Sequence, residues 1–306
     1  MEKKSDKKIE KKKPGRPRKN PIKKPMKRNG ISKTPMNNEN YIEMIYDKPS
    51  VFKKLFYLFK SMAVSDICIE FDKDCIYIIT ADHLKKSHIR VKIFSNRINH
   101  YYCEDPHRIY LNPRNMEKII QTLDKNYISI AFIIKKKSTR SILNILCKNE
   151  INIDDYREID ILEPNESSED VKYDIVNYPI KFTLPGKYFK KLISDMSSFS
   201  DIWSITKIGK NHLTFKYISR DKTVKTRHIV KSPKDIKLIS TIADDDIFSS
   251  SVRIDYIKPI SNSLISEEIN IAVDNKKNMI INIEIDKQNN KPSILVSVNT
   301  DIIRFD

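Results

Sequence analysis

Two stretches of this sequence place lysines opposite regularly spaced apolar residues. The stretch from Pro49 to Ala63 opens with proline, which helices tolerate at their first position, and its apolar residues recur with the period of an amphipathic helix. The stretch from Pro185 to Phe199 repeats this design. One lysine face of this kind is ordinary solvated surface, and its ammonium groups are also available to phosphate. Two such faces at equivalent places in two halves of the chain favour the phosphate contact.

Two further predicted helices, 113–124 and 255–264, also have a core side and a polar side. Pro259 should make the last helix short or kinked. Basic groups spread over four helices suit contact with DNA phosphates without reading of the base sequence. The predicted DNA-binding residues are Lys53, Lys54, Lys60, Arg114, Lys118, Lys187, Lys190, Lys191, Arg253 and Lys258.

The N-terminal arm, residues 1–38, is rich in lysine and proline and has almost no apolar residue that could form a core, so we expect it to be disordered when free. Residues 1–33 carry 15 of the 57 Lys and Arg and three of the 40 Asp and Glu, so most of the net charge of +17 lies there. The run Lys13–Lys19 resembles an AT-hook, in which Arg16 enters an A·T minor groove while Arg18 and Lys19 meet phosphates. Nonspecific polybasic tethering and nuclear import are the alternatives.

Other chemistry is poorly supported. The run His100–His107 holds enough ligands for a metal, but on a strand these side chains alternate between faces, which favours an edge strand. Asp244, Asp245 and Asp246 could belong to a two-metal nuclease, yet no partner carboxylates stand at an obvious spacing, so a solvated turn is favoured. Because no Gly-rich phosphate loop or nucleophile motif is apparent, we expect neither an enzyme nor a cofactor or metal site.

Length and composition indicate an intracellular, soluble protein of two domains. The 306 residues can bury a sizeable core. No apolar run approaches a membrane span and no signal peptide is visible, so a membrane is not an expected partner. The four cysteines form no C-x-x-C pair and read as reduced strand residues: Cys68, Cys75, Cys103 and Cys147.

The order of predicted elements repeats. After residue 40 a strand, a lysine-faced helix, several strands, a second helix and more strands follow, and a polar, acidic stretch then interrupts the pattern. The same order begins again at Tyr178. We therefore predict an α+β fold of two tandem domains, each with antiparallel sheets and two helices. The predicted boundaries are 1–38 for the disordered basic arm, 39–162 for the first domain, 163–177 for the connector and 178–306 for the second domain.

This repeat resembles the PCNA family of DNA sliding clamps, and the likeness covers most of the chain. Asp82 followed by Ser87-His88-Ile89 is similar to the partner-binding loop of the family, although the intervening loop is longer here. Short runs at 14–17, 52–56, 99–102 and 177–179 are similar to the clamp homologues of African swine fever virus and related large DNA viruses. The acidic stretch that cellular clamps carry near the chain end has no counterpart here.

The resemblance implies a ring, most often a trimer, whose lysine-faced helices surround duplex DNA. It places the subunit interface on an acidic strand of one subunit and a basic strand of its neighbour, with Tyr156, Ile159, Ile161, Lys225 and Arg227. It also implies that DNA polymerase and other replication or repair proteins dock beneath the connector, in a pocket that includes Asp82, His88, Ile89, Tyr173 and Ile175.

The predicted function is therefore that of a viral processivity factor, a non-enzymatic ring that tethers DNA polymerase to double-stranded DNA. The alternative is a clamp-fold late transcription factor or architectural protein that binds DNA without encircling it. The expected location is the cytoplasmic replication factory of the host cell, with the host nucleus as the alternative.

Overall fold

The computed structural model describes residues 31–123, 125–136, 141–151, 153–163, 178–209, 212–218, 225–230, 236–263, 266–274, 278–288 and 291–302. The helices are α1 (Pro49–Ser61), α2 (Pro113–Gln121), α3 (Gly186–Ser197) and α4 (Ile254–Ser263), with one 3-10 turn, η1 (Ser95–Arg97). The strands of the first half are β1 (Asn40–Tyr46), β2 (Ile67–Phe71), β3 (Cys75–Ala81), β4 (Ser87–Phe94), β5 (His100–Cys103), β6 (His107–Leu111), β7 (Tyr127–Lys135), β8 (Ile142–Asn149) and β9 (Asp154–Asp160). Those of the second half are β10 (Ile180–Pro185), β11 (Ile202–Ile208), β12 (His212–Ile218), β13 (Lys225–Val230), β14 (Lys237–Ser240), β15 (Phe248–Arg253), β16 (Glu268–Val273), β17 (Asn278–Gln288) and β18 (Lys291–Asp301).

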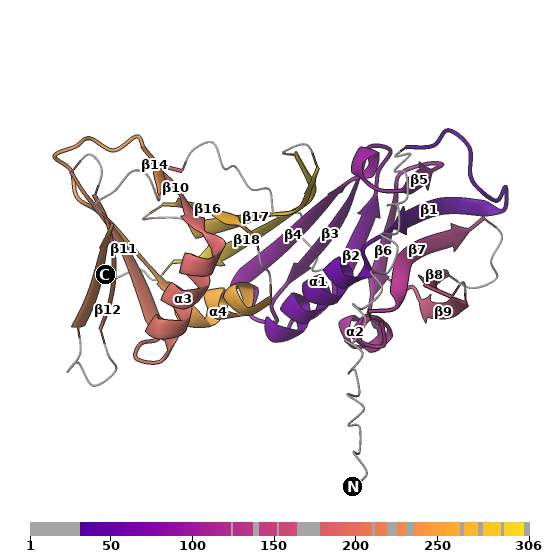
Figure 1. The fold of residues 1–306 in the computed structure, drawn as a ribbon, viewed down its shortest axis with the longest axis horizontal. Coiled ribbons are helices and arrows are strands. Elements are labelled where there is room, and N and C mark those ends of the chain that lie inside the picture. Colours follow the sequence, from indigo (N-terminus) through magenta and orange to yellow (C-terminus); the bar gives the residue numbers. More distant parts are fainter. Residues whose placement is uncertain are drawn as a thin grey trace, which may run out of the picture.

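The strands form three antiparallel sheets. A five-stranded sheet has the order β5-β1-β7-β8-β9, and a four-stranded sheet has the order β13-β12-β11-β15. A nine-stranded sheet, β14-β10-β16-β17-β18-β4-β3-β2-β6, runs through both halves of the chain and places the smaller sheets at the two ends of an elongated molecule (Figure 1).

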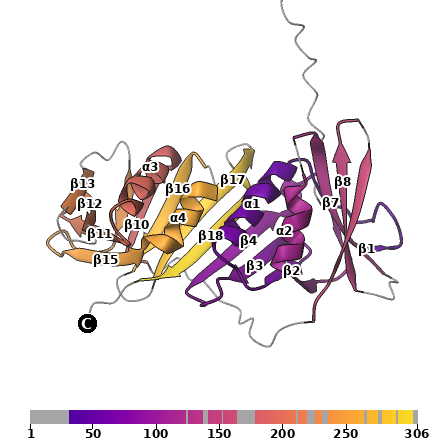
Figure 2. The ribbon, with the colours of Figure 1, turned by 90° about the horizontal axis from the view of Figure 1, so that it is seen from below.

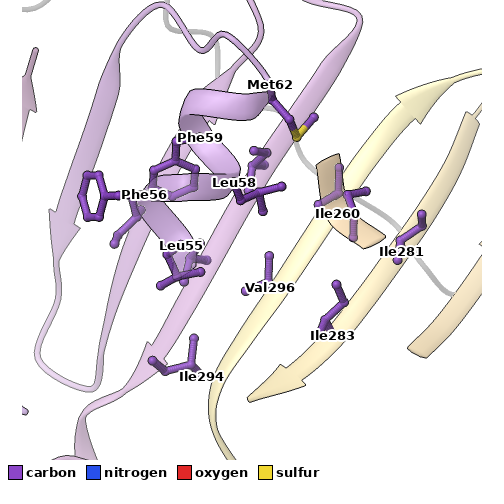
Figure 3. Close-up of a cluster of buried hydrophobic side chains, with 14 of the residues drawn as sticks. Leu55, Phe56, Leu58, Phe59, Met62, Ile260, Ile281, Ile283, Ile294 and Val296 are labelled. Carbon is purple, nitrogen blue, oxygen red and sulfur yellow. The ribbon is translucent and has the colours of Figure 1, made fainter. Parts of the chain in front are cut away.

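The two halves are joined by main-chain pairing as well as by the core. Strand β18 pairs with β4 from Ile294 opposite Ile93 to Thr300 opposite Ser87. Beneath this junction α1 packs against α4. Figure 3 shows apolar side chains from four elements meeting there, and they include Leu55, Leu58, Met62, Ile260, Ile281, Ile283, Ile294 and Val296. Because one core spans the junction, the halves cannot turn relative to one another without exposing apolar surface.

An acidic residue adds a polar link across the same junction. The Tyr46 hydroxyl, at the end of β1, donates to Asp286 Oδ2 in β17 at 2.5 Å. The Lys48 ammonium, just before α1, contacts the other carboxylate oxygen. The first turn of α1 has no acidic residue of its own, so Asp286 is the carboxylate placed near the positive end of that helix. This link between distant residues helps to fix the angle between the halves.

The predicted order of helices is confirmed, with ends displaced by one to three residues. Helix α1 begins at Pro49 and buries seven residues, as its period predicts: Pro49, Val51, Phe52, Leu55, Phe56, Leu58 and Phe59. The antiparallel, clamp-like arrangement of sheets with four helices also agrees with the predicted fold class. Of the predicted connector, residues 164–177 lie outside the described residues, so the predicted boundaries stay predictions.

Strand β15 was not predicted. Its sequence, Phe-Ser-Ser-Ser-Val-Arg, lacks the apolar alternation that signals a strand. The serines are instead satisfied by partners that only the fold brings near: Ser251 Oγ lies 2.7 Å from Ser204 Oγ, and Ser250 Oγ donates to the Asp274 carbonyl at 3.3 Å. Hydroxyl hydrogen bonds thus take the place of apolar contacts in this strand.

The link through Asp286 leads to a stability prediction. Asp286→Asn should lower the free energy of unfolding by about 1–3 kcal/mol, because the buried Tyr46 hydroxyl and Lys48 lose their charged acceptor. Asparagine also accommodates the positive φ of 55° at this position, so a loss would not come from the backbone. Urea unfolding followed by circular dichroism measures the change, with the exposed Asp245→Asn as the matched control. Equal stability of the two variants would contradict the prediction.

Candidate nucleic-acid interface

The four helices lie side by side on one face of the molecule. Helix α3 packs against α4, α4 against α1, and α1 against α2. Figure 2 shows them in the order α3, α4, α1, α2 across the face that looks toward the viewer. Helices from both halves therefore form a single surface, and the nine-stranded sheet lies behind it.

The basic residues predicted on these helices are all exposed. This holds for each of the ten: Lys53, Lys54, Lys60, Arg114, Lys118, Lys187, Lys190, Lys191, Arg253 and Lys258. We call this set the basic face. The helix positions opposite them carry the buried apolar residues, so burial of the core turns these side chains outward.

Three members of the basic face have local partners. The Lys53 ammonium donates to the Leu123 carbonyl at 2.8 Å. Lys60 lies 2.6 Å from a carboxylate oxygen of Glu117 in α2, and Arg253 lies 3.1 Å from Asp255. The other seven make no ion pair with an acidic side chain in the described part of the chain. The face thus carries a clear excess of positive charge.

A groove of about 860 Å³ runs between the end of α1 and the start of α2. Its basic lining is Lys60, Arg114, Lys118 and His83, the last from the loop between β3 and β4, while Glu117 is the acidic lining residue. Sequence reasoning did not include His83, because the loop that brings it to the groove is far from α2 in the chain. The groove gathers three members of the basic face in one place.

Local sequence fixes where two of the helices begin. The Asn112 side chain caps α2 by accepting from the backbone N–H of Arg114 at 2.9 Å and of Asn115 at 3.3 Å, and Pro113 follows as the first helical residue. Helix α3 begins at Gly186, where a Cβ atom would lie 1.8 Å from the carbonyl oxygen of Ser266. Only glycine allows this approach, so Gly186 determines how closely α3 lies against the start of β16.

The two strands predicted to join subunits lie at free sheet edges. Strand β9 ends the five-stranded sheet and β13 ends the four-stranded sheet, at opposite ends of the long axis (Figures 1 and 2). On β9, Tyr156 is 73 % exposed, and the neighbouring turn exposes Ile151 and Ile153 as well. An exposed edge with apolar side chains is a surface ready to pair with another strand.

The other interface residues are placed differently. Ile159 is buried in the core, and Ile161 packs partly against that core. Neither side chain is as accessible to a neighbouring subunit as the side chain of Tyr156. Period-2 alternation turns the Ile159 side chain inward, so its contribution to the predicted interface would be through the main chain, and its place there stays a prediction. The backbones of Lys225 and Arg227 pair with β12, and their side chains lie outside the described residues.

Arg157 ties the β9 edge to the basic face, and sequence reasoning missed it. Its guanidinium donates to the Ile119 carbonyl at 2.8 Å, near the C-terminus of α2, and to Asp155 at 2.9 Å. A cation is favourable at that end of a helix. The Tyr127 hydroxyl and then Arg157 donate to Asp155 and hold the pKa of its carboxyl below the ordinary value. The sequence signal for this link was an arginine at an inward-facing position of a strand that is otherwise rich in acidic residues.

The predicted partner-binding residues are only partly accessible. Ile89 is buried in the core, which corrects its assignment to a surface pocket. Asp82 is also buried, and its carboxylate accepts from the backbone N–H of Lys86 at 2.7 Å and of Ser87 at 2.8 Å, so it shapes the loop between β3 and β4. His88 is half-exposed beside Asn299 at the junction of β4 with β18. Tyr173 and Ile175 lie outside the described residues.

The basic arm is attached through a buried carboxylate. Arg16, Arg18 and Lys19 lie outside the described residues, but the segment that follows them is held against the first sheet. Glu43 in β1 is 2 % exposed and accepts from the backbone N–H of Met36 at 2.8 Å and of Asn37 at 3.1 Å. Asn40 Nδ2 donates to it at 2.7 Å, and His100 Nε2 lies 2.6 Å away. The last residues of the arm therefore have a fixed position.

The rival motifs have structural roles. Strand β5, which contains His100 and Cys103, lies at the edge of its sheet, as predicted. Among the described residues, no group of three or more His, Cys, Asp or Glu could hold a metal ion. Asp244 belongs to a turn whose carbonyls, those of Ile242 and Ala243, accept from the buried Lys207 ammonium at 3.2 and 2.9 Å. No helix in the described ranges is long and apolar enough to cross a membrane.

Comparison with known proteins identifies a family and a solved structure that are similar to this chain. Residues 41–164 match the family "Proliferating cell nuclear antigen, N-terminal domain". The crystal structure of Proliferating Cellular Nuclear Antigen from Entamoeba histolytica superposes with a TM-score of 0.71 at 13 % identity, covering 87 % of this chain and 100 % of that one. The chain has a PCNA-like fold.

Virus-encoded proteins are similar in sequence to this PCNA-like chain. An uncharacterized protein of African swine fever virus (isolate Pig/Kenya/KEN-50/1950) is 25 % identical over 280 residues, which is 89 % of this chain and 93 % of that protein. "Probable DNA polymerase sliding clamp 1" of Paramecium bursaria Chlorella virus 1 is 26 % identical over 163 residues, 52 % of this chain and 60 % of that one. These relatives confirm the family resemblance that the sequence motifs indicate.

The attachment of the arm leads to a pH prediction. Burial by itself raises the pKa of Glu43, but hydrogen bonds from Met36, Asn40, Asn37 and His100 outweigh it and lower the pKa below its ordinary value. A lowered folded-state pKa means that this stabilisation is present above the ordinary pKa and is lost as the pH falls through the folded-state value.

Glu43→Gln should therefore lower the free energy of unfolding by about 2 kcal/mol at pH 7, and the gap to the wild type should shrink as the pH falls from above the ordinary carboxyl pKa through the lower folded-state value. Urea unfolding across this range measures it. The exposed Glu39→Gln removes the same charge and serves as the control. A gap that stays constant with pH would show that the charge of Glu43 has no such role.

Proposed function

We propose that this protein is a virus-encoded DNA sliding clamp, a ring that encircles duplex DNA and tethers DNA polymerase and other replication or repair proteins. The single observation that carries the proposal is the joint surface of four helices from both halves, with eight exposed cations unpaired by acidic side chains in the described residues. The clamp fold and a relative named as a probable polymerase sliding clamp support it.

The chemistry of the basic face fits sliding. Lysines on long, mobile side chains contact phosphates as point charges and do not read base edges. Each contact releases condensed counterions, so affinity depends on salt and is nearly equal at every position along the duplex. A surface of this kind holds DNA without favouring one site, which is what a moving tether requires. No chemical step is needed, and the proposed role is not enzymatic.

The free edges support closure into a ring. Strand β9 carries Asp154, Asp155, Glu158 and Asp160, while β13 carries Lys225, Arg227 and His228. Edges of opposite charge at opposite ends of one molecule pair head to tail, and such contacts generate rings when the rotation closes. A homotrimer is the proposed state, by analogy with the family.

The arm supplies a second proposed contact with DNA. Arg16 would enter an A·T minor groove, with Arg18 and Lys19 on phosphates. The connector pocket, with His88 at its described border, is the proposed docking place for partner motifs. We propose the cytoplasmic replication factory of an infected cell as its location.

A second candidate function is a clamp-fold transcription or architectural factor that binds DNA without encircling it. The strongly basic arm favours this alternative, since it could hold DNA by itself. A ring requires the β9 and β13 edges to pair between subunits, whereas the alternative function does not. Measuring the oligomeric state therefore distinguishes the two candidate functions.

The first test concerns ring closure. The wild-type chain at micromolar concentration should form a closed oligomer by native mass spectrometry, and it should remain on circular plasmid but leave after linearisation. Tyr156→Glu should weaken assembly by about tenfold or more and remove retention on circles, because a charge replaces the most exposed aromatic side chain of the β9 edge. Leu84→Glu, a similarly exposed site in a loop away from both edges, is the control. A wild-type monomer would favour the non-encircling factor.

The second test concerns the basic face. Replacing Lys54, Lys118 and Lys190 by alanine together should reduce affinity for duplex DNA, and the slope of log K against log salt should fall by up to about 3, roughly one unit for each lost phosphate contact. The control replaces Lys73, Lys125 and Lys291, which are exposed outside the helices. Fluorescence anisotropy with a labelled duplex measures both. Equal losses in the two triple variants would mean that only net charge matters and would reject a specific basic face.

A further inference from the structure

A cluster of cations and aromatic rings lies on the side of the sheet that faces away from the helices. On β4, Ile89, Val91 and Ile93 are buried in the core, so Arg90, Lys92 and Phe94 must project from the opposite side. Tyr77 on β3 stands directly opposite Lys92 in the register. We call Tyr77, Arg90, Lys92 and Phe94 the outer cluster.

The two cations of the outer cluster are held over the rings. The Arg90 guanidinium carbon lies 4.2 Å from the centre of the Tyr77 ring. The Lys92 ammonium lies 5.5 Å from the Tyr77 ring and 5.1 Å from the Phe94 ring. These are cation–π distances. All four side chains are half-buried, so the charges are partly removed from water and confined to one place.

Among the described residues, no carboxylate forms an ion pair with either cation of the outer cluster. On the same side of the sheet, Glu70 pairs with Arg108, and Glu284 pairs with Lys287 at 2.9 Å. Neither Arg90 nor Lys92 has an ion pair with an acidic side chain in the described part of the chain, and Arg90 Nε is buried there without a hydrogen-bond acceptor. Two confined cations without an acidic partner among the described residues attract an anionic group.

We propose that the outer cluster is a docking site for an acidic peptide segment of a partner protein, with carboxylates on Arg90 and Lys92. Complementary charge is the reason for this choice of occupant. The rings are already covered by cations, which prevents the stacking of bases that single-stranded nucleic acid uses. Two cations also fall short of the row of phosphate contacts that holds a duplex. This surface is separate from the basic face, and it requires neither a ring nor DNA.

The cluster adjoins a cavity of about 470 Å³ lined by Tyr77, Phe71, Pro106, His107, Arg108, Glu70 and Asp72. Because Glu70 and Asp72 disfavour a further carboxylate there, an acidic segment lying across Lys92 and Arg90 would place an uncharged side chain in this cavity. The site therefore offers a charged anchor beside a recess of mixed polarity, which together set the direction of a bound peptide.

The test uses the full chain and a labelled hexaglutamate peptide as the probe. A carbodiimide joins carboxylates to lysine amines at zero length, and mass spectrometry of the digest shows which lysines have reacted. Lys92 should be coupled to the probe about fivefold more than the exposed Lys125, and Arg90→Ala should abolish this preference while Arg90→Lys retains it. Thermal melting checks that each variant is folded.

Three outcomes would overturn the proposal. Coupling of Lys92 equal to that of Lys125 would show only general attraction to a basic protein. A hexathymidine oligonucleotide that displaces the probe from Lys92 as well as unlabelled hexaglutamate does would identify nucleic acid as the occupant. Coupling of Lys92 to acidic residues of this same chain, in the absence of probe, would show that the cluster is already filled from within. None of these outcomes bears on the proposed clamp function.

Discussion

The pairing of β18 with β4 is the interaction on which the rest of the structure depends. These strands come from opposite halves of the chain, and their hydrogen bonds make one nine-stranded sheet from two. The apolar layer beneath them, from Leu55 and Leu58 on α1 to Ile260 on α4, closes the same junction from the other side. Without that pairing, each half would carry its own pair of basic helices with no fixed relation to the other pair.

Because the junction is rigid, charge that is weak residue by residue acts as a surface. An exposed lysine on a single helix contributes little to stability or to binding. Nine basic residues on four adjacent helices, with Arg253 at the end of β15, create a positive field, which attracts a polyanion and leaves it free to move along. The local pairs of Lys60 with Glu117 and Arg253 with Asp255 show that this field is uneven, strongest where no acid is near.

The sheet edges impose a second constraint. A sheet edge with an exposed tyrosine promotes aggregation of a monomeric protein, because strands of other molecules can pair with it. Here β9 and β13, two of the edge strands in the described residues, carry opposite charge and lie at the two ends of the molecule. Arg157 connects one of these edges to the C-terminus of α2, the helix that carries Arg114 and Lys118.

The sequence by itself determined the helices, most strands, the repeat and the basic residues of the helices, because each of these follows from local period and from which side must be buried. It could not determine β15, whose serines have the partners Ser204, Asp274 and Thr206, all distant in the chain. The resemblance did not show that the side chains of Ile89 and Ile159 turn into the core, since similarity of a motif says nothing about which way a side chain turns. Only the tertiary structure revealed the Asp286 link and the outer cluster, for both depend on contacts between strands whose pairing and register local sequence patterns do not specify.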